Sequence, residues 1–477
     1  MDFQKRSAYI NGAWVDAASS FKVNNPFSGA IVAEVSDCEA EHATTAIEAA
    51  HEAFKIWSKF SAGKRSRILK KWHQLQLEHA KTLAKILSIE QGKPFAEALG
   101  EVKYGASFVE WFAEEARRVY GDTIPGHRSD LRITVIKQPV GVVAAITPWN
   151  FPSAMITRKI APALAAGCTI VLKPSELTPL SALALIELAE LAGFPPGVLN
   201  LLPSSKPAEI GEVFTSHPKV KKISFTGSTR VGKLLMKQSA NQLKKLSLEL
   251  GGNAPFIVFA DANVEDAIEG CMASKFRNVG QTCISTNRIF VHKEVYDSFV
   301  AGLKEKMFQL KLGDGLERGT DIGPMINEAA VTKLKKLVKD AQEHGAQVET
   351  SEADTEGLLC NPILVCDVNS KMKIFSEEIF GPVAAIYKFK AEDEVVALAN
   401  DTIYGLASYF YGKDYAQIWR VAEALEFGMV GINTGDISSA VAPFGGVKES
   451  GFGREGSKYG MDDYLHIKYM CWGGIKS

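Results

Sequence analysis

Cysteine and histidine are few in this chain of 477 residues, and its net charge is close to zero. The seven cysteines are scattered and form no CxxC pair, and such an odd, dispersed set argues against a disulfide framework. The nine histidines show no spacing typical of metal ligands, so we expect no metal site. A formal net charge of −1 gives no reason to expect a nucleic acid or an anionic membrane surface as partner.

Long apolar segments are missing as well. The longest apolar run, residues 160–172, is too short to span a bilayer, and the N-terminus lacks the apolar core of a signal peptide. Together with the unpaired cysteines, this predicts a cytoplasmic protein with no membrane partner. With 46% apolar residues, the chain is long enough for two or three domains.

Short apolar runs alternate with helical periods between residues 140 and 251. The expected strands are 141–146, 169–173, 198–202, 222–226 and 246–250, and the expected helices are 153–166, 181–192, 208–214 and 230–239. This alternation predicts an α/β fold, with a parallel sheet covered by helices on both faces. Sheets of this kind bind nucleotides beyond the carboxyl ends of their strands.

Other elements flank this region. An Asn-Gly pair within residues 9–15 predicts a hairpin, and helices are expected across residues 39–113. A second α/β unit begins after Gly252, with a strand at 254–259 and a helix whose apolar face runs from Val264 to Val279.

Cys283 and Glu249 supply a nucleophile and a base. A thiolate attacks an electron-poor carbonyl carbon, and a carboxylate can take a proton from water. Gly280 and the polar step that follows it interrupt the apolar helix pattern, so we expect Cys283 on a loop that faces a cleft. Cys283 follows the C-terminal end of that helix, where the helix dipole does not lower a thiol pKa. The alternative is an inert packing cysteine.

Three further segments suit a dinucleotide and an oxyanion. Gly227 stands where a strand meets a helix, and backbone N–H groups there can approach a pyrophosphate. Lys173 and Glu176 follow a neighbouring strand and can bond ribose hydroxyls, while the amide of Asn150 can donate to an oxyanion. The alternatives are structural turns and a solvated charge pair.

Together these segments resemble the aldehyde dehydrogenase superfamily. The resemblance rests on seven motifs in order: PWNFP at 148–152, KPSE at 173–176, FTGST at 225–229, LELGG at 248–252, GQTC at 280–283, EEIFGP at 377–382 and PFGG at 443–446. It implies a Rossmann-type cofactor domain, an α/β catalytic domain and a β oligomerisation arm. The expected ranges are 1–117 and 140–251 for the cofactor domain, 252–450 for the catalytic domain, and 118–139 and 451–477 for the arm. The arm implies a homodimer or homotetramer, because an exposed sheet edge must pair.

The resemblance also implies roles for single residues. Cys283 is the implied nucleophile, Glu249 the base that hydrolyses the resulting thioester, and Asn150 the oxyanion donor. Lys159 and Glu455 match polar positions associated with a proton relay. The implied cofactor contacts are Thr147, Trp149, Lys173, Ser175, Glu176, Gly227, Ser228, Glu378 and Phe380.

Within the superfamily, segments 157–159, 276–278 and 428–460 are most similar to succinate-semialdehyde dehydrogenases. This implies NAD(P)-dependent oxidation of succinate semialdehyde or a close carboxy-aldehyde, a small-molecule substrate whose carboxylate is held by Arg158, Arg277 and Ser438. Glutarate semialdehyde stays open, because one methylene changes binding by only about 1–3 kcal/mol.

The cofactor choice turns on Glu176. Its carboxylate favours NAD, because it accepts a bond from the ribose 2′-hydroxyl and repels a 2′-phosphate. Arg230, beside the phosphate turn, can offset that repulsion, so NADP stays open.

Ser285 stands where many members of the family carry a second cysteine, so we expect no disulfide switch at the nucleophile. Two other functions would each require a different set of residues. A thiol hydrolase would need a base for Cys283, usually a histidine, and none lies close in sequence. A non-catalytic dinucleotide-binding protein would be expected to lack Cys283 or Glu249, and both are present.

Overall fold

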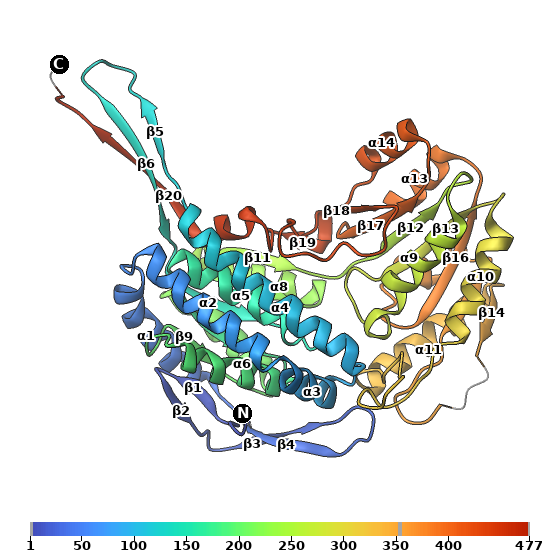
Figure 1. Ribbon diagram of the computed structural model, residues 1–477, viewed down its shortest axis with the longest axis horizontal. Coiled ribbons are helices and arrows are strands. Elements are labelled where there is room, and N and C mark those ends of the chain that lie inside the picture. Colours follow the sequence, from blue (N-terminus) through green and yellow to red (C-terminus); the bar gives the residue numbers. More distant parts are fainter. Residues whose placement is uncertain (1–2, 352–354, 476–477) are drawn as a thin grey trace.

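Two α/β units lie side by side in the computed structural model, and a β arm projects from one of them (Figure 1). The structure describes residues 3–351 and 355–475. The outermost residues of the expected cofactor domain and arm, 1–2 and 476–477, and residues 352–354 of the expected catalytic domain therefore lie outside the described residues. The α/β fold class predicted from the alternating pattern is confirmed.

The first unit is built on an eight-stranded sheet in the order β19-β11-β10-β7-β8-β9-β1-β2. Its strands are β1 (Ala8–Ile10), β2 (Ala13–Val15), β7 (Val142–Ile146), β8 (Thr169–Lys173), β9 (Leu199–Leu201), β10 (Val220–Thr226), β11 (Lys245–Glu249) and β19 (Gly451–Phe452). The strands β7 to β11 are parallel, as predicted. The predicted N-terminal hairpin is β1–β2, and Asn11 and Gly12 at its turn both have positive φ.

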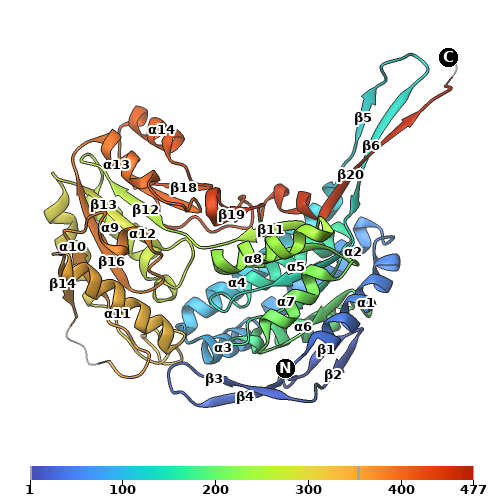
Figure 2. The same cartoon turned by 180° about the vertical axis from the view of Figure 1, so that it is seen from behind.

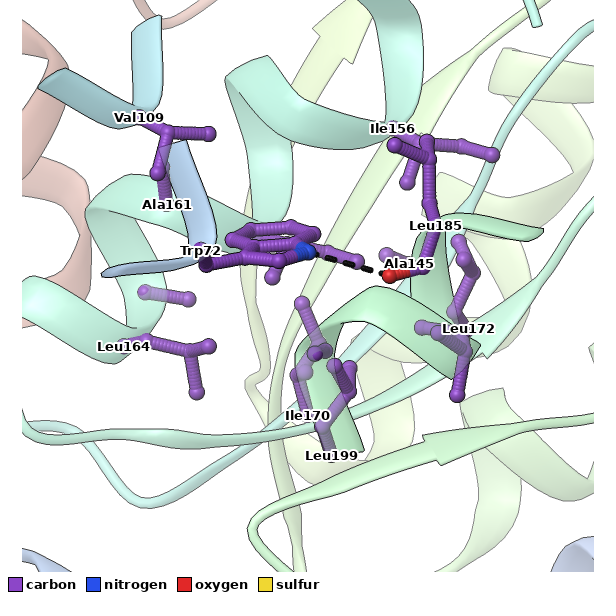
Figure 3. Close-up of a cluster of buried hydrophobic side chains, with 14 of the residues drawn as sticks. Trp72, Val109, Ala145, Ile156, Ala161, Leu164, Ile170, Leu172, Leu185 and Leu199 are labelled. Carbon is purple, nitrogen blue, oxygen red and sulfur yellow. Dashed lines mark hydrogen bonds between the residues drawn. The ribbon is translucent and has the colours of Figure 1, made fainter. Parts of the chain in front are cut away.

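Helices cover both faces of this sheet. They are α1 (Ala40–Trp57), α2 (Ala62–Glu78), α3 (Ala80–Gln91), α4 (Phe95–Glu115), α5 (Ala154–Ala166), α6 (Pro179–Ala192), α7 (Pro207–Ser216) and α8 (Thr229–Ser239). Alternate residues of β7 point to opposite faces: Val143 and Ala145 join the core under α2–α6, while Val142 and Ala144 join the core under α1, α7 and α8. Figure 3 shows the first of these cores, where the Trp72 indole N–H donates to the Leu185 carbonyl at 3.0 Å.

The second unit contains a seven-stranded sheet in the order β14-β15-β16-β13-β12-β17-β18. Its strands are β12 (Ala254–Val258), β13 (Thr286–His292), β14 (Gln347–Thr350), β15 (Ile363–Cys366), β16 (Val383–Phe389), β17 (Ala407–Tyr411) and β18 (Met429–Ile432). Its helices are α9 (Val264–Phe276), α10 (Tyr296–Phe308), α11 (Glu328–Glu343), α12 (Lys373–Ser376), α13 (Glu392–Asn400) and α14 (Tyr415–Ala424).

One helix is shorter than its apolar pattern predicts. The apolar face was expected to reach Val279, but α9 ends at Phe276. Asn278, Val279 and Gly280 have φ values of 52°, 53° and 76°, and this left-handed run turns the chain away from the helix axis. Val279 is buried in the core all the same, which explains why its apolar side chain fits the helical pattern.

The arm is a three-stranded sheet of β5 (Asp122–Pro125), β6 (Arg132–Pro139) and β20 (Leu465–Trp472), with β6 in the centre. Figure 2 shows it extending away from both units. Ile124, Ile467, Tyr469 and Trp472 expose their side chains on it.

Some residues from the expected arm range belong to the body of the molecule. The strand β19, at residues 451–452, pairs with β11 of the first sheet. Elsewhere, near the N-terminus, β3 (Ser20–Asn24) and β4 (Ile31–Ser36) form a separate hairpin. The boundaries between the three parts stay a prediction. Within the described ranges, no helix is both long and apolar enough to cross a bilayer.

Candidate active site

A cavity of about 260 Å³ collects residues from both units. Its lining includes seven of the predicted site residues: Trp149, Asn150, Gly227, Ser228, Cys283, Glu378 and Phe380. The first four come from the loops that follow β7 and β10, and the last three come from the second unit. The cavity therefore lies where a doubly wound sheet binds its ligands, beyond the carboxyl ends of the parallel strands.

Cys283 lies on a turn between α9 and β13, as the sequence predicts, and is partly exposed. A hydrogen bond stabilises this turn, because the Tyr409 hydroxyl donates to the Ile284 carbonyl at 2.9 Å. Burial raises the pKa of the Cys283 thiol to about 12, although the positive charge of Arg158 opposes this shift. These surroundings favour the thiol over the thiolate.

Strained backbone precedes the cysteine. Val279 is β-branched, so its positive φ is costly and must be imposed by its surroundings. Asn278 provides the restraint: its side-chain amide donates to the carbonyls of Asn150 at 3.0 Å and Gln281 at 3.2 Å. The Gln91 amide donates to the Asn278 side chain at 2.9 Å, which ties the cysteine loop to the end of α3.

Asn150 takes part in the same network. Its side-chain amide donates to the Gln281 carbonyl at 3.0 Å, so one of its two N–H groups already serves the cysteine loop. The predicted role of Asn150 as oxyanion donor depends on its second side-chain N–H group. The Asn150 carbonyl also accepts a bond from Lys93 Nζ at 2.7 Å, and Lys93 forms a buried ion pair with Glu101 at 2.6 Å.

Glu249 ends β11 with both carboxylate oxygens buried, and neither has a hydrogen-bond partner in the part of the chain that the structure describes. Burial and the nearby charge of Glu455 raise the pKa of Glu249 well above its usual range. Glu455 accepts a bond from Lys159 Nζ at 2.5 Å and forms an ion pair with Arg158. Burial opposes ionisation of Glu455, but the charges of Arg158 and Lys159 hold its pKa below the usual range. The surroundings therefore favour the protonated form of Glu249 and the charged form of Glu455.

The predicted substrate-binding residues fall into two groups. Arg277 and Ser438 meet, with 3.3 Å between Nη2 and Oγ. Arg158 lies on another element, α5, with its guanidinium 4.0 Å from the Phe444 ring centroid and its side chain only 1% exposed. Its Nη2 atom is buried and makes no hydrogen bond to any residue in 3–351 or 355–475. The sequence did not indicate that Arg158 would share Glu455 with Lys159.

Five of the predicted cofactor residues line the same cavity. Ser228 caps α8 and accepts the Val231 N–H, and a Cβ on Gly227 would lie 2.5 Å from the Phe225 ring. On the opposite wall, Glu378 accepts the Gly252 N–H at 2.9 Å, and burial raises the pKa of Glu378 to about 7.

Two aromatic rings and a hydroxyl complete the lining of the cavity. The rings of Trp149 and Phe380 meet edge to face at 5.8 Å. Thr226 lines the cavity with a buried hydroxyl that has no partner among the described residues. These groups suit a dinucleotide: a capped helix N-terminus, a glycine without room for a side chain, aromatic faces and a free hydroxyl.

Four predicted cofactor residues lie outside the cavity lining. The Thr147 N–H donates to the Lys173 carbonyl at 3.1 Å, and this bond joins the ends of β7 and β8. Lys173 Nζ pairs with Glu176 at 2.8 Å, while the Ser175 hydroxyl accepts the Leu177 N–H at 3.2 Å. The Lys173–Glu176 pair thus stands beyond the carboxyl end of β8, as the position of KPSE predicts.

Several residues of this site were missed by the sequence analysis. Lys93 and Glu101 hold the Asn150 loop, and Glu97 accepts the Asn278 N–H at 2.8 Å. Glu97, Glu101 and Tyr104 recur at spacings of four and three along α4 and so share one helix face. Polar residues at that spacing on a helix with many apolar residues are the signal that could have revealed them. No cluster of three or more His, Cys, Asp or Glu residues able to hold a metal occurs among the described residues.

The model of the aldehyde dehydrogenase family matches residues 14–470. The chain belongs to this family. It is 54% identical over 475 residues to the glutarate-semialdehyde dehydrogenase of Pseudomonas aeruginosa, covering 99% of this chain and 98% of the relative. It is also 54% identical over 473 residues to the NADP⁺ succinate-semialdehyde dehydrogenase of Escherichia coli, covering 98% of each.

The fold of the family is equally well matched. The crystal structure of succinate-semialdehyde dehydrogenase from Burkholderia pseudomallei has a TM-score of 0.97, with 53% identity and coverage of 98% of both chains. The family resemblance and the family-type α/β fold expected from the motifs are therefore confirmed. The chain is an NAD(P)-dependent aldehyde dehydrogenase.

Proposed function

We propose that this enzyme oxidises succinate semialdehyde to succinate, with glutarate semialdehyde as the alternative substrate. The observation that carries the proposal is the contact of Arg277 with Ser438 at 3.3 Å, together with Arg158, whose buried Nη2 has no hydrogen-bond partner among the described residues. Two guanidinium forks beside a reactive thiol suit an aldehyde that ends in a carboxylate. The names of the two relatives above specify aldehydes of this kind.

Chemistry begins at Cys283. Its thiolate adds to the aldehyde carbon, and the oxygen that gains charge is stabilised by the remaining Asn150 N–H and the Cys283 backbone N–H. A bound nicotinamide ring supplies the hydride acceptor. Loss of hydride from the carbon attached to sulfur leaves a thioester on Cys283.

Water then releases the product. Glu249 acts as the base that takes a proton from water, and it must first lose the proton that burial favours. Lys159 and Glu455 provide a path for that proton, because Glu455 is near enough to raise the pKa of Glu249 and bonds to Lys159. These roles are supported by the burial of all three side chains.

We infer that NAD⁺ is the preferred cofactor, because the carboxylate of Glu176, beyond β8, opposes a 2′-phosphate. NADP⁺, named for the E. coli relative, is the alternative. We also infer a homodimer or homotetramer in the cytoplasm. The exposed apolar side chains of the arm support self-association, and the free cysteines support a reducing compartment.

The test is a matrix of steady-state kcat/KM values for succinate and glutarate semialdehyde with NAD⁺ and NADP⁺. Butanal, which has four carbons but no carboxylate, is the reference aldehyde. We expect succinate semialdehyde to exceed butanal by at least about 100-fold, the ratio that about 2.7 kcal/mol of carboxylate binding would produce. Equal values would reject the carboxy-aldehyde assignment. Cys283→Ala should abolish turnover with every aldehyde while NAD⁺ still binds, and Cys471→Ser, at an exposed cysteine, is the matched control.

A further inference from the structure

The hydroxyl of Tyr104 is buried without a hydrogen-bond partner among the described residues. Tyr104 lies on α4, and its ring meets the Phe108 ring edge to face at 5.0 Å. A buried hydroxyl without a partner destabilises a protein, and a ligand that accepts a hydrogen bond from it removes that cost. The sequence analysis did not single out Tyr104.

Both arginines of the site approach the surroundings of Tyr104. The Arg158 guanidinium lies 5.4 Å from the Phe108 ring centroid, and its Nη1 is 3.8 Å from the Met155 sulfur. Tyr104 packs on the small cluster formed by Phe151, Ala154 and Met155. The Arg277 guanidinium lies 5.3 Å from the ring centroid of that same Phe151. Tyr104 therefore shares one neighbour with Arg277 and two with Arg158.

The charges around the hydroxyl determine what can bind it. Burial raises the pKa of Tyr104, and although Arg158 and Arg277 oppose the shift, Glu455 and Cys283 reinforce it. The group therefore stays a neutral O–H donor. A guanidinium can only donate hydrogen bonds, so neither arginine can accept this proton. An anion from outside the chain can accept from the hydroxyl and from both arginines at once.

We propose that Tyr104 is a specificity residue that donates its O–H to the terminal carboxylate of the substrate, between Arg158 and Arg277. The inference rests on the proposed function, since it requires a substrate with a carboxylate. It assigns the carboxylate a neutral donor on α4, in addition to the two arginines and Ser438.

Tyr104→Phe removes the hydroxyl and keeps the ring that packs on Phe108. The quantity to measure is the ratio of kcat/KM for succinate semialdehyde to kcat/KM for butanal. We expect this ratio to fall about 10- to 100-fold, the range for losing a hydrogen bond to a charged group, mainly through a higher KM for the carboxy-aldehyde. The unfolding temperature of the variant shows whether the fold is intact.

Tyr387→Phe is the matched control. The Tyr387 hydroxyl is likewise buried without a partner in the described part of the chain, but its ring packs against Phe290 and Phe375 in the second sheet. We expect the wild-type ratio in this variant.

The outcomes separate the two proposals. A wild-type enzyme that does not prefer succinate semialdehyde over butanal overturns both the proposed function and the role of Tyr104. A clear wild-type preference that Tyr104→Phe leaves unchanged overturns only the role of Tyr104. Equal losses with both aldehydes would also overturn it, because the hydroxyl would then serve the thiol or the shape of the site. A fall in the ratio with Tyr387→Phe would show that the ratio does not report on the carboxylate site.

Discussion

Gly252 faces the carbonyl oxygen of Cys283 so closely that a Cβ at position 252 would penetrate that oxygen. The two residues belong to different motifs, LELGG and GQTC, and this contact explains why the first motif ends in glycine. The Gly252 N–H meanwhile donates to Glu378 at 2.9 Å, so the backbone of Gly252 joins the cysteine loop to a predicted cofactor contact.

Gly252→Ala should lower kcat/KM by about 100-fold or more, because the new methyl group must displace the turn that carries the thiol. Steady-state assays and labelling of the thiol by iodoacetamide would measure the loss. Gly100→Ala is the control, since a Cβ at that helical position has no neighbour within 4 Å among the described residues. Wild-type activity in Gly252→Ala would show that the loop tolerates displacement.

Glu249→Gln should separate reduction of the cofactor from release of the acid. Both carboxylate oxygens of Glu249 are buried, and a base for water is needed only after hydride has left the substrate carbon. In stopped-flow assays the variant should keep the initial burst of NADH. Its steady-state rate should be lower than that of the wild type by about 100-fold or more. A burst slowed to the same extent would mean that Glu249 also takes the proton of the thiol.

The pH dependence of thioester hydrolysis should move when Glu455 loses its charge. The charge of Glu455 is one cause of the raised pKa of Glu249, and the base is active only when ionised. In Glu455→Gln that cause disappears while Arg158 and Lys159 keep their charges, so the pKa of Glu249 falls. The rising limb of the pre-steady-state hydrolysis rate should therefore shift to lower pH. Glu265→Gln, at an exposed ion pair with Lys306, should leave the limb in place.

The sequence predicted the elements of the fold better than the contacts inside the site. The alternating apolar runs correctly located β7 to β11. A strand that is buried on both faces consists of a nearly continuous run of apolar residues, which can be identified in the local sequence. The motifs also identified residues that line one cavity, including Asn150 and Cys283. By contrast, the ion pair of Arg158 with Glu455 joins residues far apart in sequence, and its formation depends on tertiary packing. The end of α9 was missed because Val279 is apolar and buried but not helical.

Glu176→Ser should shift the cofactor preference toward NADP⁺. Lys173 Nζ is paired with Glu176 at 2.8 Å, so the change removes a carboxylate that repels a 2′-phosphate and frees an ammonium that attracts one. We expect the ratio of kcat/KM for NAD⁺ to that for NADP⁺ to fall by about tenfold or more, about 1.4 kcal/mol. Glu212→Ser, at an exposed position on α7, should keep the wild-type ratio. A wild-type preference for NADP⁺ would show that Arg230 or another cation outweighs Glu176.

Mild peroxide should inactivate the enzyme without forming a disulfide between positions 283 and 285. Ser285 carries no sulfur, and its hydroxyl donates to the Lys275 carbonyl at 3.3 Å, so oxidation of Cys283 proceeds to sulfenic acid or beyond. Because burial raises the pKa of Cys283, the reaction should be slow near neutral pH and faster as pH rises. Digestion without reductant and mass analysis of the peptide around Cys283 measure the product. A bridge from Cys283 to the buried Cys271 would contradict sulfenic acid or a higher oxide as the product, and its formation requires the two Cα atoms to lie within about 7 Å of each other.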